Sequence, residues 1–61
     1  MKKMEEWLQK NNFKYENGAY NRRGITVVLR NECIILFEGR IVWKGDIGQD
    51  AINAVMEYLD L

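Results

Sequence analysis

The sequence predicts an α+β fold, in which an antiparallel β-meander of three to four strands lies between an N-terminal and a C-terminal helix. Three observations support this prediction. Apolar residues recur at helical spacing near both ends of the chain, they alternate between residues 25 and 44, and short turn signals separate the alternating segments. We expect both helices to pack on one face of the sheet, in the order α-β-β-β-(β)-α, as one small domain of residues 1–61.

Apolar stripes predict the two helices. In residues 1–11 the stripe is spaced i, i+3, i+4 and consists of Met4, Trp7 and Leu8. Asn11 and Asn12 are suited to end this helix, because Asn tolerates the left-handed conformation. A second helix is predicted from about residue 48 to 60, with the stripe Ile52, Val55, Met56 and Leu59. Asp46 and Gln49, three residues apart, are typical of a capping box at its start.

Four short turn signals divide the middle of the chain: "ENGA" at 16–19, "RRGI" at 22–25, "RNEC" at 30–33 and "FEGR" at 37–40. We interpret Asn31-Glu32 and Glu38-Gly39 as two-residue hairpin loops. Arg30 then opposes Cys33, and Phe37 opposes Arg40. Arg23-Gly24 is a further candidate for a two-residue turn, whereas Asn17-Gly18 fits either a hairpin or a loop.

This register determines which side chains face the helices, because successive residues of a strand point to opposite faces. The face toward the helices is predicted to hold Ile25, Val27, Leu29, Ile34, Leu36, Ile41 and Trp43. The expected core residues are Trp7, Leu8, Leu36, Trp43, Ile52, Val55 and Leu59. The open face is predicted to carry an apolar stripe with a basic border, and its candidate protein-contact residues are Val28, Arg30, Ile35, Phe37, Arg40 and Val42.

Composition favours a folded, soluble domain, since 48% of the residues are hydrophobic and 30% are charged. No apolar run approaches the length of a membrane span, and the charged start is not followed by the apolar region of a signal peptide, so we expect a cytoplasmic protein without membrane contact. The single cysteine, Cys33, is expected to be a small buried apolar residue in a reducing compartment.

The residue inventory argues against catalysis. The chain has no histidine and no serine, one threonine (Thr26) and one cysteine (Cys33), so no nucleophile has a histidine to activate it. The carboxylates are scattered rather than set at a metal-ligand spacing. We therefore expect no catalytic residue, no metal site, no cofactor and no small-molecule substrate.

The predicted open face indicates a small protein-interaction module that binds through this face or through an edge strand. The expected partner is another protein or a second copy, with a homodimer slightly favoured because added burial would support so small a core. An alternative is that Val, Ile and Phe only follow their preference for strands, or that residues 13–24 cover the face.

The order of helix, three-stranded meander and helix resembles the double-stranded RNA-binding domain over most of the chain. That family grips phosphates with a lysine-rich motif at the start of its last helix; the matching stretch "GDIGQDAIN" at 45–53 has Asp46, Gln49 and Asp50 instead. Nucleic-acid binding is therefore the weaker alternative. In general character the chain is also similar to phage-encoded inhibitors such as the anti-CRISPR proteins, which implies an inhibitor that blocks a host enzyme by protein contact.

Overall fold

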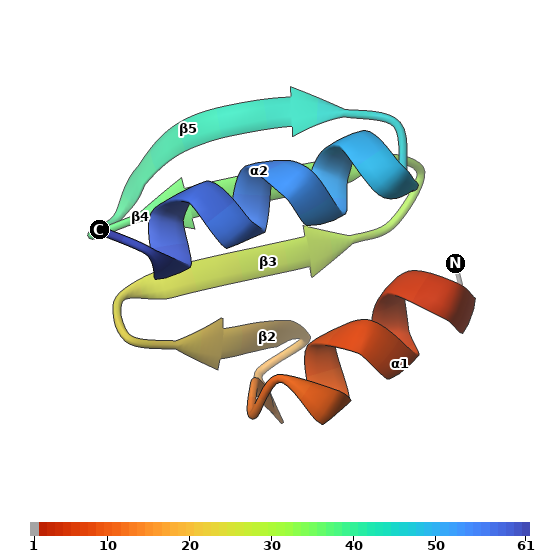
Figure 1. Cartoon of the computed structure of the whole chain (residues 1–61), viewed down its shortest axis with the longest axis horizontal. Coiled ribbons are helices and arrows are strands. Elements are labelled where there is room, and N and C mark those ends of the chain that lie inside the picture. Colours follow the sequence, from red (N-terminus) through yellow and green to blue (C-terminus); the bar gives the residue numbers. More distant parts are fainter. Residues whose placement is uncertain (1) are drawn as a thin grey trace.

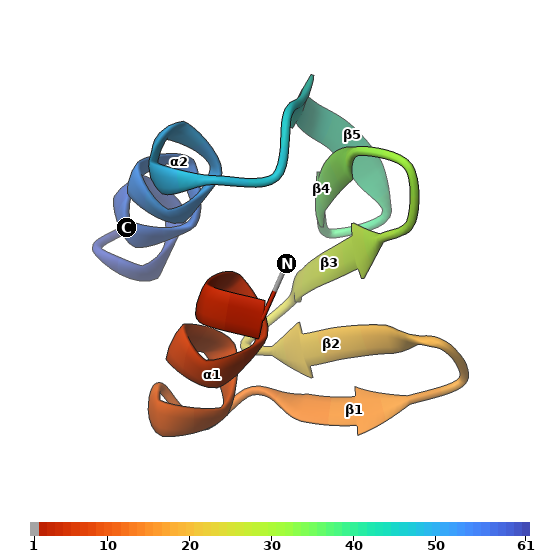
Figure 2. The ribbon, with the colours of Figure 1, turned by 90° about the vertical axis from the view of Figure 1, so that its right-hand side faces the viewer.

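The structure is a computed structural model that describes residues 2–61. The elements are α1 (Lys2–Lys10), β1 (Lys14–Glu16), β2 (Ala19–Arg22), β3 (Ile25–Leu29), β4 (Cys33–Phe37), β5 (Arg40–Gly45) and α2 (Gln49–Leu59). The strands form one antiparallel sheet in sequential order (Figure 1), and both helices lie on the same face of it (Figure 2). The predicted class and helix placement are confirmed. The count of three to four strands was wrong, because residues 13–24 contribute two strands rather than one strand or a loop.

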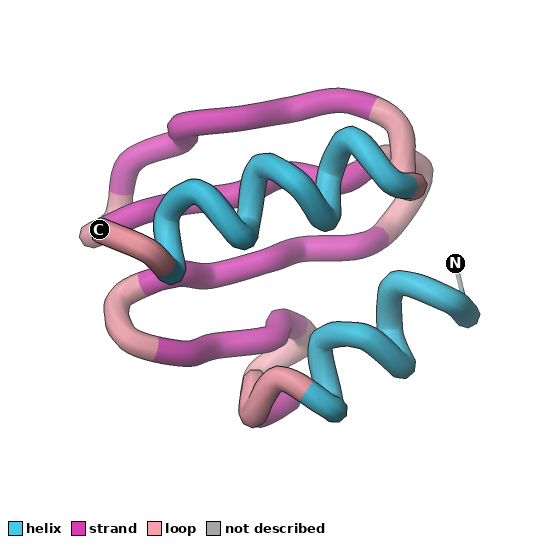
Figure 3. Tube along the Cα trace, in the orientation of Figure 1, coloured by secondary structure: helices cyan, strands magenta, loops and turns pink. Residues whose placement is uncertain are grey.

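Three of the four strand connections are two-residue turns that end in glycine. In each, both central residues have a positive φ: 54° and 82° at Asn17-Gly18, 51° and 81° at Arg23-Gly24, and 52° and 85° at Glu38-Gly39. Positive φ at both positions is the geometry of a type I′ turn, whose twist matches that of the strands it joins. Figure 3 shows that the second and third of these turns lie at the same end of the sheet, where the Glu38 N–H donates to the Gly24 carbonyl oxygen at 2.9 Å.

The remaining connection, between β3 and β4, has three residues (30–32), so the predicted register of these two strands was wrong. Leu29, not Arg30, pairs with Cys33. The Asn31-Glu32 pair lacks a glycine, and neither residue adopts a positive φ, so no two-residue type I′ turn forms there. The loop therefore takes in Arg30 as a third residue. A shift of one residue turns every side chain of β4 to the opposite face.

A β-bulge in β5 changes the facing of that strand partway along its length. Leu36 pairs with Ile41 and Ile35 pairs with Trp43, which leaves Val42 as the extra residue. Ile41 therefore shares the outer face with Leu36, contrary to its predicted inward facing. Trp43 shares the helix-facing side with Ile35, as predicted.

α1 packs its apolar stripe on the sheet and ends at a pair of asparagines. Met4 and Leu8 are buried, and Asn12 has the left-handed φ of 68° that was expected to stop the helix. The Phe13 N–H donates back to the Leu8 carbonyl oxygen at 3.0 Å. The Arg22 guanidinium donates to the Asn11 carbonyl oxygen at 2.8 Å and joins the end of α1 to β2.

α2 runs along the strands and contacts β3, β4 and β5, as Figure 1 shows. The N-cap of this helix is Gly48, which has no side chain to accept a capping hydrogen bond. The predicted capping box of Asp46 and Gln49 was therefore wrong. Gln49 instead donates from its side-chain amide to the Asn53 side-chain oxygen at 3.0 Å.

The core lies between the two helices and the sheet. Its buried members are Met4, Leu8, Phe13, Tyr20, Ile25, Val27, Cys33, Ile35, Ala51, Ile52, Ala54 and Val55. Trp7, Trp43 and Leu59 are partly buried against this cluster, as expected for core residues. Leu36 is not among the residues that pack on the core, because the shifted register points it away from the helices.

Candidate interaction surface

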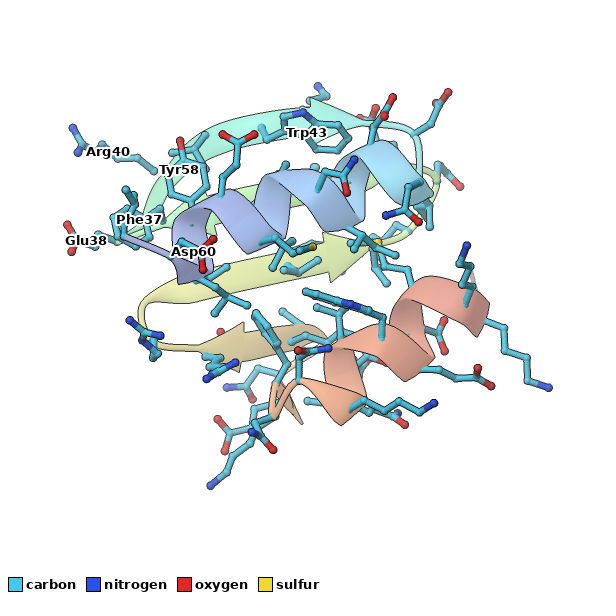
Figure 4. All side chains as sticks on the ribbon, in the orientation of Figure 1. Phe37, Glu38, Arg40, Trp43, Tyr58 and Asp60 are labelled. Carbon is cyan, nitrogen blue, oxygen red and sulfur yellow. The ribbon has the colours of Figure 1, made fainter. Side chains whose placement is uncertain are left out.

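The six residues predicted as a protein contact do not share one face. Ile35 is 0% exposed and lies in the core. Phe37 also faces the helices, where its ring packs against that of Tyr58 on α2 at a centroid distance of 5.2 Å. Figure 4 shows these two rings together at the end of the sheet where Arg40 begins β5. The predicted stripe of Val28, Ile35 and Val42 is therefore absent, and the register shift between β3 and β4 is the reason.

The other four predicted contact residues do not lie together. Arg40 is exposed at the start of β5, where it pairs with Phe37. Val28 lies on the outer face, opposite Ile34. Arg30 is exposed in the loop between β3 and β4, where its backbone N–H donates to the Glu32 carbonyl oxygen at 3.1 Å. Val42 is the bulge residue and packs partly against the core. Only Val28 therefore occupies the face for which it was predicted and contributes apolar surface there.

The outer face carries a different apolar surface, which we call the outer patch. It consists of Val28, Ile34, Leu36 and Ile41 and lies over β3, β4 and β5. The first three side chains are half-buried among their neighbours in the sheet, whereas Ile41 is 63% exposed. Figure 2 shows that both helices lie on the opposite side of the sheet, so no element of residues 2–61 covers the patch.

Polar groups border the outer patch. On one side the Thr26 hydroxyl donates to the Asn21 side-chain oxygen at 2.9 Å. On the other side Lys44, which pairs with Ile34, approaches the Glu32 carboxylate at 3.6 Å. Both of these ion-pair partners are well exposed, so the pair contributes little to stability. The patch is thus an apolar centre with a rim of mixed charge.

Both edge strands have features that disfavour pairing with another strand. β1 has three residues, two of which are Lys14 and Glu16. β5 is longer, but it carries the bulge at Val42 and the exposed cations Arg40 and Lys44. Short edges, bulges and edge lysines are devices that prevent strands from adding to a sheet. The outer face is therefore the better candidate for contact.

A concave surface lies between the helices, and we call it the interhelical groove. It contains a pocket of about 270 Å³. α1 lines it with Lys3, Glu6, Trp7 and Lys10, and α2 lines it with Gln49, Ile52 and Met56. This volume is at the lower limit of the ~300–1,000 Å³ that small-molecule sites enclose, and the pocket is large enough for side chains of a protein partner.

The titratable groups that the structure perturbs belong to the core rather than to a reactive site. Burial raises the pKa of the Cys33 thiol from its ordinary 9.0 to about 11, so the thiol is protonated at neutral pH and is a poor nucleophile. Burial, aided by the carboxylate of Glu5, also raises the pKa of Tyr20. Residues 2–61 contain no cluster of three or more histidine, cysteine, aspartate or glutamate side chains suited to hold a metal ion.

Ile34, Leu36 and Ile41 are the outer-patch residues that the sequence prediction placed inside. The available signal was the missing glycine: the three X-Gly pairs form two-residue turns, and Asn31-Glu32 does not. A three-residue loop at this position gives the observed facing of β4. The bulge at Val42 has no comparable signal, since neither it nor its neighbours is a glycine.

In the described part of the chain, neither helix has the length and apolar character that a membrane crossing requires. Comparison with protein-family models, with curated proteins and with solved structures found no match to this chain.

Proposed function

We propose that this protein is a small non-enzymatic protein-interaction module that associates through its outer patch, with a second copy of the chain as the partner. The observation that supports the proposal is the placement of four apolar side chains on a sheet face that nothing in residues 2–61 covers. Ile41, which is 63% exposed, is the expected anchor.

The size of the face limits a dimer to a small, weak interface. The molecule measures 24 × 22 × 20 Å, so its largest face covers at most about 530 Å² (24 Å × 22 Å). Contact over the whole face of both copies would bury only about 1,060 Å², at the lower limit for a specific interface, and contact through the outer patch alone would bury less. The chain has no net charge, so two copies do not repel each other overall.

Two features of the surface support protein rather than nucleic acid as the partner. The outer patch has an apolar centre, and its rim includes the carboxylate of Glu32 beside Lys44 rather than cations alone. A nucleic-acid surface depends on clustered cations that neutralise phosphates. The residue inventory also lacks a histidine-activated nucleophile, which supports a binding role rather than catalysis.

Sedimentation equilibrium tests the proposal by measuring the mass of the particle. The wild-type chain is expected to approach twice its 7.2 kDa at high protein concentration. Ile41→Lys is expected to keep the fold and to remain a monomer, because it places a charge on the most exposed side chain of the apolar patch. Met56→Lys is the matched control: Met56 is also an exposed apolar residue, but it lies on the helix layer.

Each outcome is informative. A wild-type monomer at all concentrations would contradict the homodimer. If such a monomer bound a purified target protein and Ile41→Lys abolished that binding, the proposed interaction module would be retained with a different partner. An inhibitor that acts by protein contact would behave in this way. An Ile41→Lys variant that dimerises as the wild type does would exclude the outer patch.

A further inference from the structure

We propose that the interhelical groove binds an acidic amphipathic helix of a partner protein, with two apolar side chains in the pocket and two carboxylates against Lys3 and Lys10. This site is on the helix layer, opposite the outer patch, and its existence does not depend on dimerisation. The two surfaces would allow one small domain to hold two chains at once.

The floor of the groove is apolar and is partly open to solvent. Trp7 is half-buried beside the core, and Ile52 is only 3% exposed. Met56 is 45% exposed at the α2 side. Trp is enriched at the centres of protein interfaces, and Met adapts its shape to different partners. These three side chains therefore form a surface on which partner side chains can be desolvated.

The volume of the pocket matches a pair of aliphatic side chains. An apolar cavity of ~150 Å³ accommodates a benzene-sized group. The groove's 270 Å³ is larger than this, and it is open along the two helices rather than closed. A third helix that packs its ridges into the groove between α1 and α2 presents such pairs of apolar residues at adjacent positions of one face.

The charges along the groove define the partner further. Lys3 and Lys10 both line the pocket and are seven residues apart, which corresponds to about two helical turns or ~10 Å. Neither makes an ion pair within 4.0 Å; the pair found in residues 2–61 joins Lys44 and Glu32. α2 contributes no charged side chain to the lining, and its only polar side chain there is the neutral amide of Gln49. The two ends of the groove are therefore cationic and available for carboxylates.

Glu6 determines where on the partner the acids must lie. It lines the groove between the two lysines, three residues after Lys3 and four before Lys10. A carboxylate at the middle of a bound helix would face Glu6 and be repelled, whereas an apolar group there would contact Trp7. The matching sequence thus has acids at i and i+7 and apolar residues at i+3 and i+4, which place all four groups on one helical face.

A titration followed by NMR tests this site with the full chain. The probe is a synthetic alanine-based helix with two glutamates two turns apart and two leucines between them; the control peptide carries lysines in place of the glutamates. The chain has two tryptophans, so the indole N–H resonance of Trp7 should shift on binding. That of Trp43, on β5 outside the groove, should serve as an internal reference.

Charge reversal separates the groove from a general electrostatic effect. The double variant Lys3→Glu/Lys10→Glu is expected to weaken the acidic peptide by at least about tenfold and to favour the lysine peptide. Lys2→Glu/Lys14→Glu changes the net charge by the same amount, from zero to −4, at exposed positions outside the pocket, and should leave the affinity nearly unchanged. Circular dichroism confirms that each variant is folded.

Four results would overturn the proposal: no binding of the acidic peptide, equal affinity for both peptides, an equal loss in the two double variants, or a shift of Trp43 instead of Trp7. Met56→Glu provides a second check that leaves α1 untouched, because it places a carboxylate on the other wall of the groove. It should also weaken the acidic peptide. None of these outcomes depends on the oligomeric state measured for the outer patch.

Discussion

Alanine substitutions at two adjacent residues of β4 test the strand facing on which the outer patch depends. Ile35 is 0% exposed and Leu36 is half-buried on the opposite face. Truncating a fully buried Ile to Ala costs about 2–5 kcal/mol, because it removes apolar contacts and leaves a cavity. Leu36→Ala opens no cavity between the helices and the sheet, so we expect a cost of about 1 kcal/mol.

These values are large compared with the stability of so small a domain. A chain of this size has ~3–5 kcal/mol of net stability. If about 3 of about 4 kcal/mol is lost in Ile35→Ala, roughly one molecule in six is unfolded without denaturant. With a urea dependence of ~1 kcal/mol/M, the unfolding midpoint should fall by about 3 M in Ile35→Ala and by about 1 M in Leu36→Ala.

Urea unfolding followed by circular dichroism measures both midpoints. Low protein concentration is needed, since association through the outer patch would add concentration-dependent stability to the wild type. A larger loss in Leu36→Ala than in Ile35→Ala would refute the reasoning, because it would place Leu36 inside and Ile35 outside. That result would restore the two-residue loop at Asn31-Glu32 and remove the outer patch.

Two further predictions concern the core and the edge of the sheet. A Cβ atom at Gly45 would lie 2.9 Å from the Trp43 ring, so Gly45→Ala should lower stability by about 1–3 kcal/mol in a thermal melt. Gly48→Ala is the control, because a Cβ atom there would have nothing within 4 Å, and it should cost under about 1 kcal/mol. Equal losses in the two variants would show that the indole does not cover Gly45. Because burial raises the pKa of the Cys33 thiol to about 11 from 9.0, its contribution to stability should be constant below pH 9 and decline between pH 9 and 11, where the unfolded chain releases the proton first. A Cys33→Ala variant should lose less stability than the wild type between pH 9 and 11. An identical decline in the two proteins would contradict the raised pKa of the Cys33 thiol.

Much of the fold was predictable because its signals are local and repeated. The spacing of Met4 and Leu8 predicts the first helix, and the spacing of Ile52 and Val55 predicts the second; all four side chains are buried. The X-Gly pairs predict two-residue turns, because glycine accepts a positive φ without steric cost. The Asn17-Gly18 pair has the same signature as the others, and it joins β1 and β2, which raises the number of strands to five.

The candidate site was less predictable because it depends on a difference of one residue. β4 has the sequence "CIILF" and is apolar on both faces, so its alternation does not reveal which residues point inward. Facing is then decided by the length of the preceding loop, and the prediction of two residues rather than three exchanged Ile35 with Leu36. Trp43 was placed on the correct side only because the bulge at Val42 offsets the same shift in β5.

The distribution of polarity over the outer face explains why the loop length matters for function. Over β1 and β2 this face carries Lys14, Glu16 and Asn21, which interact well with water. Over β3–β5, directly behind α2, it carries the outer patch, with Thr26 and Lys44 at its border. A sheet covered on one face normally alternates apolar inside with polar outside, and β1 and β2 follow that rule. The departure from the rule is confined to three strands, so it is not a general consequence of β-propensity, which would act on all five.

Apolar residues on both faces are typical of strands packed between two layers. Residues 2–61 supply one of these layers, and we infer that an associating chain supplies the other.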